Sequence, residues 1–213
     1  MRGGVNAIGQ AAVTALAAPR LSLFDNIAAD TKRAALDRLI GRKEEELSFS
    51  QKLGAFCRLT TQVVVAHRLV HWLHGIRIPV VRQLLLVAAG LYEWVLRALT
   101  GVIIDSHAEI GPGFLVHTPY AILVGGTRIG ANCTVQSGVL IHAGSRGIGE
   151  NVYFGAGAKV IGDTKIGNNV VIVANSLVLT DVADNTTIVG VPARIRLRGG
   201  RPQRFKRFVD PQR

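Results

Sequence analysis

The sequence predicts a mainly β fold in which short parallel strands wind into a triangular coil, preceded by an α-helical segment. Three observations lead to this prediction. Apolar residues recur every six positions in the second half of the chain. The 24 glycines and an aromatic content of only 6% indicate a turn-rich architecture of small side chains. Residues 27–100, in contrast, are rich in helix formers and lack this period.

The composition limits what the chain can be. With 213 residues, 48% of them hydrophobic and 18% charged, it is long enough to bury a sizeable core. Its net charge of +11 suits an anionic partner: nucleic acid, an anionic membrane surface, or a coenzyme with several phosphates. Cys57 and Cys133 lie far apart, without metal-ligand spacing. We therefore expect no disulfide and no metal site, and a cytoplasmic protein without a cleaved signal peptide.

Changes in composition divide the chain into four expected segments. The helical segment is expected to break at Gly75 and Pro79, because both residues interrupt helices. The expected segments are a flexible N-terminus (1–26), a helical segment (27–100), a β-helical domain (101–195) and a basic tail (196–213).

The most apolar part of the helical segment runs from Leu84 to Tyr92. A membrane span requires about 20 apolar residues, so this stretch is too short to cross a bilayer. We expect a helix packed in a core or against a partner subunit. The alternative is a helix at a membrane surface, assisted by neighbouring arginines and two tryptophans. That alternative would make the protein peripheral at the inner membrane face.

A six-residue repeat begins after Thr100. Small or β-branched residues follow each leading apolar residue by four positions, and neither helix nor simple strand periodicity explains the pattern. Ile104, Ile110, Ile129 and Val135 keep the same spacing upstream in pairs. The leading apolar residues of the downstream run are Ile148, Phe154, Val160, Ile166, Ile172 and Val178.

Each group of six residues is expected to make one short strand and a turn, and three groups to close a coil of 18 residues. Ile148 should then stack on Ile166, and Phe154 on Ile172. The coil's crossovers are left-handed, against the usual rule, so the predicted fold is a left-handed parallel β-helix. The repeat breaks at 114–128 and 141–148, and such breaks are where loops and functional residues collect.

Residues 105–194 resemble the serine acetyltransferase branch of the hexapeptide-repeat acyltransferases. RLVHWL at 68–73 also resembles the N-terminal helices of that family. The matching elements are IGPGFLVH (110–117), ILVGGTRIGANCTV (122–135), NVYFGAGAKVIG (151–162), VVIVANSLVLTDV (170–182) and GVPARI (190–195).

The resemblance implies direct transfer of acetyl from acetyl-CoA to a hydroxyl, in a groove between the β-helices of a homotrimer. His117 best matches the family's general base, and an imidazole can take a proton from a hydroxyl near neutral pH. Lys159 and Arg194 are expected near the coenzyme's phosphates. The residues expected along its pantetheine arm are Gly155, Ala156, Gly157 and Ala174.

The chain also departs from the family. Val116 and Ile103 stand where the serine enzymes have aspartates, so Asp105 is the nearest candidate to orient His117. An ungapped match would put Thr118 at the catalytic position. The Arg-His loop that holds the serine carboxylate is replaced by HAGSRG at 142–147, whose His142 is a further candidate site residue.

These departures favour an uncharged acceptor, such as a sugar or polysaccharide precursor. L-serine, as in cysteine biosynthesis, is the alternative acceptor. A catalytically silent scaffold at a membrane surface is a hypothesis of another class. Nucleic acid is not expected as a partner, because the basic tail lacks interleaved aromatic residues apart from Phe205 and Phe208. His67 and His71 have i, i+4 spacing without a third ligand, and packing on a helix face explains them better.

Overall fold

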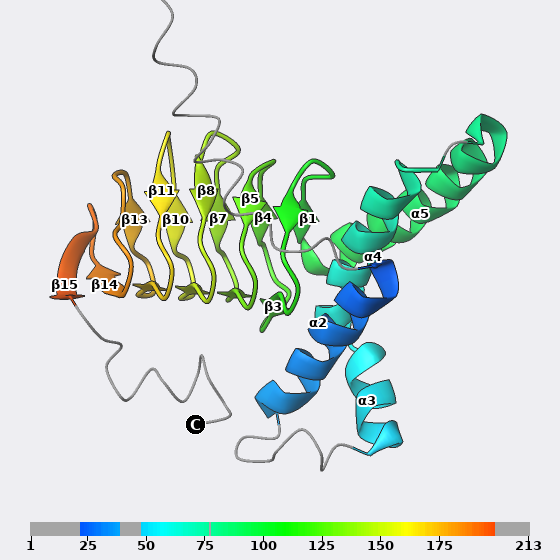
Figure 1. Ribbon diagram of the computed structural model, residues 1–213, viewed down its shortest axis with the longest axis horizontal. Helices are drawn as coiled ribbons and strands as arrows, with labels where there is room; N and C mark the ends of the chain where they lie inside the picture. Colours follow the sequence, from blue (N-terminus) through cyan, green and yellow to red (C-terminus); the bar gives the residue numbers. More distant parts are fainter. Residues whose placement is uncertain (1–21, 39–47, 77, 199–213) are drawn as a thin grey trace, which may run out of the picture.

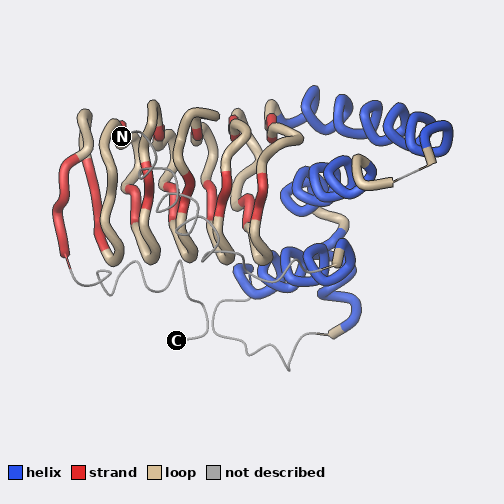
Figure 2. Tube along the Cα trace, turned by 45° about the horizontal axis from the view of Figure 1, so that its top comes forward, coloured by secondary structure: helices blue, strands red, loops and turns tan. Residues whose placement is uncertain are grey.

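The structure is a computed structural model that describes residues 22–38, 48–76 and 78–198. A stack of coils forms a triangular prism, and the helices gather at the end of the prism where the first coil lies (Figures 1 and 2). Residues 1–21 of the expected flexible N-terminus and 199–213 of the expected basic tail lie outside the described residues, and a helix already begins at Leu23, within the expected N-terminus.

The prism has three faces, each a sheet of short parallel strands, which we name A, B and C. The stack contains about five coils, and this confirms the predicted β-helix. Face A comprises β1 (Ile103–Ile104), β4 (Leu123–Val124), β7 (Leu140–Ile141), β10 (Lys159–Val160) and β13 (Leu177–Val178). Face B comprises β2 (Glu109–Ile110), β5 (Arg128–Ile129), β8 (Gly147–Ile148) and β11 (Lys165–Ile166). Face C comprises β3 (Leu115–Val116), β6 (Thr134–Val135), β9 (Tyr153–Phe154), β12 (Val171–Ile172), β14 (Thr186–Val189) and the antiparallel β15 (Arg194–Arg198).

The predicted stacking of apolar residues is confirmed. Ile166 pairs with Ile148, and Ile172 with Phe154, in parallel register. The second residue of each short strand points inward, and Phe154 and Val160 are fully buried. Continuous columns of apolar side chains therefore form the core, and the backbone hydrogen bonds run from one coil to the next.

Asparagines shape the edge at which face B turns into face C. Asn132, Asn151, Asn169 and Asn185 all have positive φ, between 55° and 59°. Asparagine tolerates this left-handed conformation better than most residues. The Asn169 side chain accepts a hydrogen bond from Asn151 at 2.8 Å and donates one to Asn185 at 3.1 Å. The turns of successive coils are therefore joined by side chains as well as by backbone.

Four described helices precede the prism: α2 (Leu23–Arg38), α3 (Phe49–Phe56), α4 (Leu59–Leu73) and α5 (Pro79–Thr100). The predicted break at Gly75 and Pro79 separates α4 from α5, and Pro79 occupies the first turn of α5. Gly101 ends α5 with a φ of 65°, a left-handed conformation that glycine adopts without strain. Helices α2 and α4 pack on each other and both contact β3.

The expectation that the apolar stretch at 84–92 packs in the core of its own chain is wrong, and its packing against a partner subunit stays a prediction. It belongs to α5, a helix of 22 residues that is long and apolar enough to cross a membrane by length and composition. Only Leu96 and Thr100 of α5 are buried, near the end that joins the prism. The rest of the helix projects away from the prism (Figure 1).

A buried ion pair fixes α2 and α4 to the first coil. Arg68 of α4 lies 3.1 Å from Asp30 of α2, and both side chains are at least nine-tenths buried. Arg68 also donates to the carbonyls of Ile110 and Gly111, and the Phe114 N–H donates to Asp30 at 2.9 Å. Every polar group that this contact removes from water therefore has a partner, as buried charges require.

Candidate active site

His117 begins a column of residues along the edge where face C turns into face A, which we name edge CA. The residue that follows each face C strand lies here, and each N–H donates to the next coil: His117 to Val135, Gln136 to Phe154 and Gly155 to Ile172. Neighbouring strands lie about 4.8 Å apart, so Gly155 sits roughly 10 Å from His117 along the edge. The fold thus aligns the expected base with the expected coenzyme turn.

Two side chains contact the His117 imidazole. Its Nε2 lies 3.4 Å from Oδ2 of Asp37, and its Nδ1 lies 3.3 Å from Oγ1 of Thr118. The His117 side chain remains 43% exposed, so an acceptor can reach it. An imidazole held by a carboxylate on one nitrogen and facing a hydroxyl on the other has the arrangement that a general base requires.

Asp37 reaches this edge because α2 packs against β3. Burial raises the pKa of its carboxyl above the usual range, while the positive charges of His117, Arg33 and Arg58 act in the opposite direction. Arg33 donates to Thr134 Oγ1 at 2.9 Å, and Arg58 donates to the Ala34 carbonyl at 3.2 Å. The surroundings of His117 therefore contain one carboxylate and two guanidinium groups.

Asp105 and His142 occupy a different edge, where face A turns into face B. Asp105 accepts hydrogen bonds from the backbone and imidazole of His107, which lower its pKa, and it makes no ion pair with His117 among the described residues. His142 accepts a hydrogen bond from the Gly144 N–H at 3.0 Å. Within one chain the structure does not bring these residues to His117, since they follow strands of face A and His117 follows one of face C.

The expected pantetheine residues lie together on edge CA. Ala156 accepts a hydrogen bond from the Asn175 N–H at 2.8 Å, which stacks the 155–157 turn on the next coil. A Cβ at Gly155 would lie 2.5 Å from the backbone nitrogen of Ala174, so only glycine fits there. This close contact leaves a narrow shelf of backbone and small side chains.

The two basic candidates differ in their position. The ammonium group of Lys159 on β10 lies 3.5 Å from the carbonyl of Gly157, directly over the turn. Arg194 is exposed at the start of β15, opposite Val189 at the far end of the prism. Lys159 is therefore positioned at the shelf, whereas Arg194 lies on the last described hairpin.

The loop at 142–147 contains one arginine, Arg146, and carboxylates already bind it. It lies 2.9 Å from Asp163 and 2.6 Å from Asp181. This loop therefore offers no uncommitted cation for an acceptor's carboxylate.

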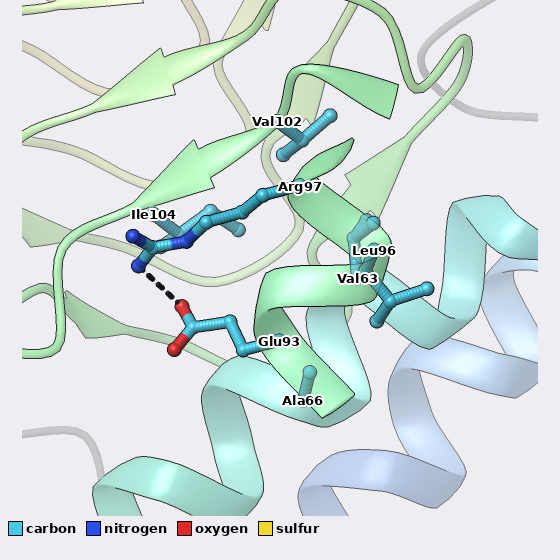
Figure 3. Close-up of a pocket in the computed structure, with 7 residues that line it drawn as sticks. All are labelled: Val63, Ala66, Glu93, Leu96, Arg97, Val102 and Ile104. Atoms are coloured by element: carbon cyan, nitrogen blue, oxygen red, sulfur yellow. Dashed lines mark hydrogen bonds and ion pairs between the residues drawn. The ribbon is translucent and has the colours of Figure 1, made fainter. Parts of the chain in front are cut away.

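Two hollows of the described structure lie away from His117. The one between α4, α5 and the first coil is lined by Val102 and the Glu93–Arg97 ion pair, among others (Figure 3), and holds about 10 Å³. A cleft of about 270 Å³ is lined by His71, His74 and His107 with Ser106 and Glu109. No group of three or more His, Cys, Asp or Glu side chains among the described residues is arranged to hold a metal ion.

Asp37 and Arg33 are site residues that the repeat and the family resemblance did not predict. Asp30, Arg33 and Asp37 have i, i+3, i+7 spacing, so they share one face of the predicted helix. That spacing was the available signal. The spacing does not show whether this face turns toward the coil or toward solvent, and charged helix faces are usually solvated.

Comparisons with known proteins agree with this architecture. Residues 147–180 match the family model described as "Bacterial transferase hexapeptide (six repeats)". The chain is 33% identical over 174 residues to a serine acetyltransferase of Staphylococcus xylosus, covering 77% of this chain and 81% of that protein. It is 38% identical over 147 residues to one of Synechococcus elongatus, covering 65% of this chain but 57% of that longer protein.

Solved structures give the same result. A serine acetyltransferase in complex with CoA superposes with a TM-score of 0.66 at 27% identity, over 82% of this chain and 70% of that chain. A soybean serine acetyltransferase complexed with serine has a TM-score of 0.64 at 30% identity, with the same coverage.

Proposed function

The chain belongs to the serine acetyltransferases, acetyl-CoA-dependent enzymes of the hexapeptide-repeat family, and we propose that it transfers acetyl from acetyl-CoA to the hydroxyl of L-serine. The observation that carries the proposal is the alignment of His117, held by Asp37, with the small-residue turn at 155–157 on one edge. The names of the relatives favour L-serine over the sugar acceptor that the sequence suggested.

His117 acts as the general base. The Asp37 carboxylate lies 3.4 Å from Nε2, which favours a proton on that nitrogen and leaves Nδ1 to take the proton of the acceptor hydroxyl at the position that Thr118 Oγ1 marks. The acceptor oxygen attacks the thioester carbonyl, and the carbon–sulfur bond breaks as the tetrahedral intermediate collapses. The imidazolium returns its proton to the departing thiolate, so the products are the ester and free coenzyme A.

The coenzyme lies along edge CA. The shelf formed by Gly155, Ala156, Gly157 and Ala174 admits an extended arm against the backbone, and Lys159 offers a positive charge beside it. Holding thioester and acceptor in one groove supplies much of the rate, because it converts a bimolecular step into an intramolecular one. Arg194 would contact the phosphates of the coenzyme only if the bound coenzyme extended as far as the β14–β15 hairpin.

Charges from the helical segment replace the missing Arg-His loop. Arg33 and Arg58 lie close enough to Asp37 to act on its pKa, and such a pair can attract the carboxylate of an amino acid. Asp37 lies within the same cluster and can attract the ammonium group. The difficulty that the sequence raised for a charged acceptor therefore has an answer in residues outside the repeat.

The active enzyme is a closed homotrimer in this proposal. The outward positions of face A include exposed apolar side chains, Ile103 at 42% and Leu123 at 41%, whereas face B presents Glu109, Arg128 and Lys165. An apolar face beside edge CA is suited to a neighbouring subunit, which would complete the groove.

A coupled thiol-release assay tests the proposal, with acetyl-CoA and either L-serine or a panel of sugars. We expect turnover with L-serine. One observation favours a sugar as the acceptor. The arginine of the 142–147 loop, Arg146, is already bound to Asp163 and Asp181, so it is not available to bind the carboxylate of an amino acid. Turnover with a sugar and none with L-serine would overturn the acceptor assignment. No thiol release with any acceptor would overturn the activity itself.

A further inference from the structure

The exposed side of α5 is almost entirely apolar, and we call it the outer face. Its large side chains range from 40% exposed at Val95 to 70% at Val80, and Trp94 is 65% exposed. Soluble helices normally expose their polar side. The outer face consists of Val80, Val81, Leu84, Leu85, Val87, Leu91, Trp94, Val95 and Leu99.

Most polar residues of α5 are at least partly buried, whereas Gln83 and Arg97 are exposed beside the outer face. Tyr92 donates a hydrogen bond to Gln62 of α4, and Glu93 pairs with Arg97 at 2.7 Å beside the first coil (Figure 3). Arg82 is partly buried. The helix is therefore amphipathic with most of its polar side chains toward the protein, which indicates that its outer face meets an apolar environment.

The width of the outer face indicates what covers it. At about 100° per residue, its large side chains extend from Trp94 round to Val81 and Leu99 over roughly 140° of the helix, and Leu85 lies beyond Tyr92 at the border with α4. A helix that packs on a protein core normally carries an apolar stripe of about 100° or somewhat more. An acyl-chain layer covers a broad arc without requiring complementary ridges and grooves.

Charge and aromatic content favour the same partner. Helix α5 carries two arginines, Arg82 and Arg97, against one carboxylate, Glu93, a balance that suits anionic headgroups. Trp72 and Trp94, both at least half exposed, are the residue type enriched at bilayer interfaces. The width of the outer face, the charge of the helix and the two exposed tryptophans all favour a lipid surface as the partner of α5.

We propose that α5 lies in the plane of an anionic bilayer, with its outer face in the acyl-chain boundary and the prism in water. It does not cross the bilayer, because α4 packs along its inner side and also contacts β3. Both flanks of α5 are thus held on the side of the prism. This binding goes beyond acyl transfer and is separable from it, since His117 lies on edge CA.

Vesicle flotation of the full chain tests the proposal. We expect binding to vesicles of equal parts phosphatidylglycerol and phosphatidylcholine, and much weaker binding to phosphatidylcholine alone. The double variant Leu84→Asp/Leu91→Asp should lower the partition coefficient roughly tenfold or more, because it puts charges into the acyl-chain boundary. Leu53→Asp on α3, where the leucine is 50% exposed, is the matched control and should bind like wild type.

Trp94 fluorescence separates lipid from a second copy. In a Trp72→Phe background Trp94 is the single tryptophan, and brominated phosphatidylcholine in the anionic vesicles should quench it. Absence of quenching would overturn the proposal. So would light scattering in which Leu84→Asp/Leu91→Asp dissociates a lipid-free oligomer while vesicle binding is unchanged, because the outer face would then be a contact between copies.

Discussion

The regular coils from β7 onward and the helical end of the molecule are stabilised in different ways. The core of the regular coils is apolar, and residues stack in register 18 or 19 positions apart. The helical end buries Asp30, Arg68 and His67, each 8% exposed or less. The repeat therefore builds a rigid edge, and the buried charges attach to it the helix that carries Asp37. In the proposed function the irregular end supplies the base and the carboxylate beside it, and the regular coils supply the shelf for the coenzyme.

The largest expected effect is on the helical end, and it comes from breaking the buried ion pair between Asp30 and Arg68. Arg68→Met leaves Asp30 charged and unpaired inside the protein, which should lower the free energy of unfolding by about 3–5 kcal/mol. Urea denaturation measures the loss. Arg128→Met is the matched control, because Arg128 pairs with Glu109 at the surface and should cost less than about 1 kcal/mol. Similar losses in both variants would mean that the buried pair does not fix the helices.

The second largest effect concerns pH. Burial, with the nearby charge of Arg68, lowers the pKa of His67 to about 4 from an unfolded value near 6.5. Folding favours the neutral form of His67. Its contribution to the free energy of unfolding is therefore complete above pH 6.5 and is lost as the pH falls toward 4. It amounts to about 3 kcal/mol.

Unfolding followed between pH 4 and 7 tests this contribution. His67→Gln should flatten the dependence, and His71→Gln, on the exposed side of α4, should leave it unchanged. An unchanged pH slope in His67→Gln would show that another group is responsible.

Asp37 tests whether α2 contributes to chemistry or only to packing. Asp37→Asn should lower kcat roughly 10–10²-fold, because the imidazole loses the carboxylate that orients it. Burial raises the Asp37 pKa, so its ionised form costs stability that grows as the pH rises. The melting temperature of Asp37→Asn at pH 7 should therefore be unchanged or higher. A lower melting temperature with unchanged kcat would make Asp37 a packing residue.

The smallest expected effect is at the coenzyme. Lys159→Gln should weaken coenzyme A binding up to about fivefold, since an exposed ion pair contributes about 1 kcal/mol or less. The affinity of the wild type should fall as ionic strength rises. Calorimetry measures both, and Lys165→Gln on face B is the control. Equal effects of the two substitutions would mean that only net charge matters.

The sequence predicted the regular coils because one rule repeats six times from Ile148 to Val178. It also predicted that His117 and the 155–157 turn belong to one site, through a resemblance that spans the repeat. It could not predict Asp37, whose contact with His117 joins residues 80 positions apart through packing without periodicity. It likewise placed the apolar stretch of α5 in a core or against a partner subunit, because apolar composition does not tell which environment covers a helix.

The most direct test of the account is His117→Ala, measured as both turnover and coenzyme binding. We expect kcat to fall roughly 10²–10⁴-fold while calorimetry gives a coenzyme A affinity close to that of the wild type, because the base acts on the acceptor's proton. His142→Ala and Asp105→Asn, on the other edge of the same chain, should cost much less, and Thr118→Ala shows whether its hydroxyl contributes. Wild-type turnover in His117→Ala, with the true acceptor at saturation, would contradict the assignment of the active site to edge CA.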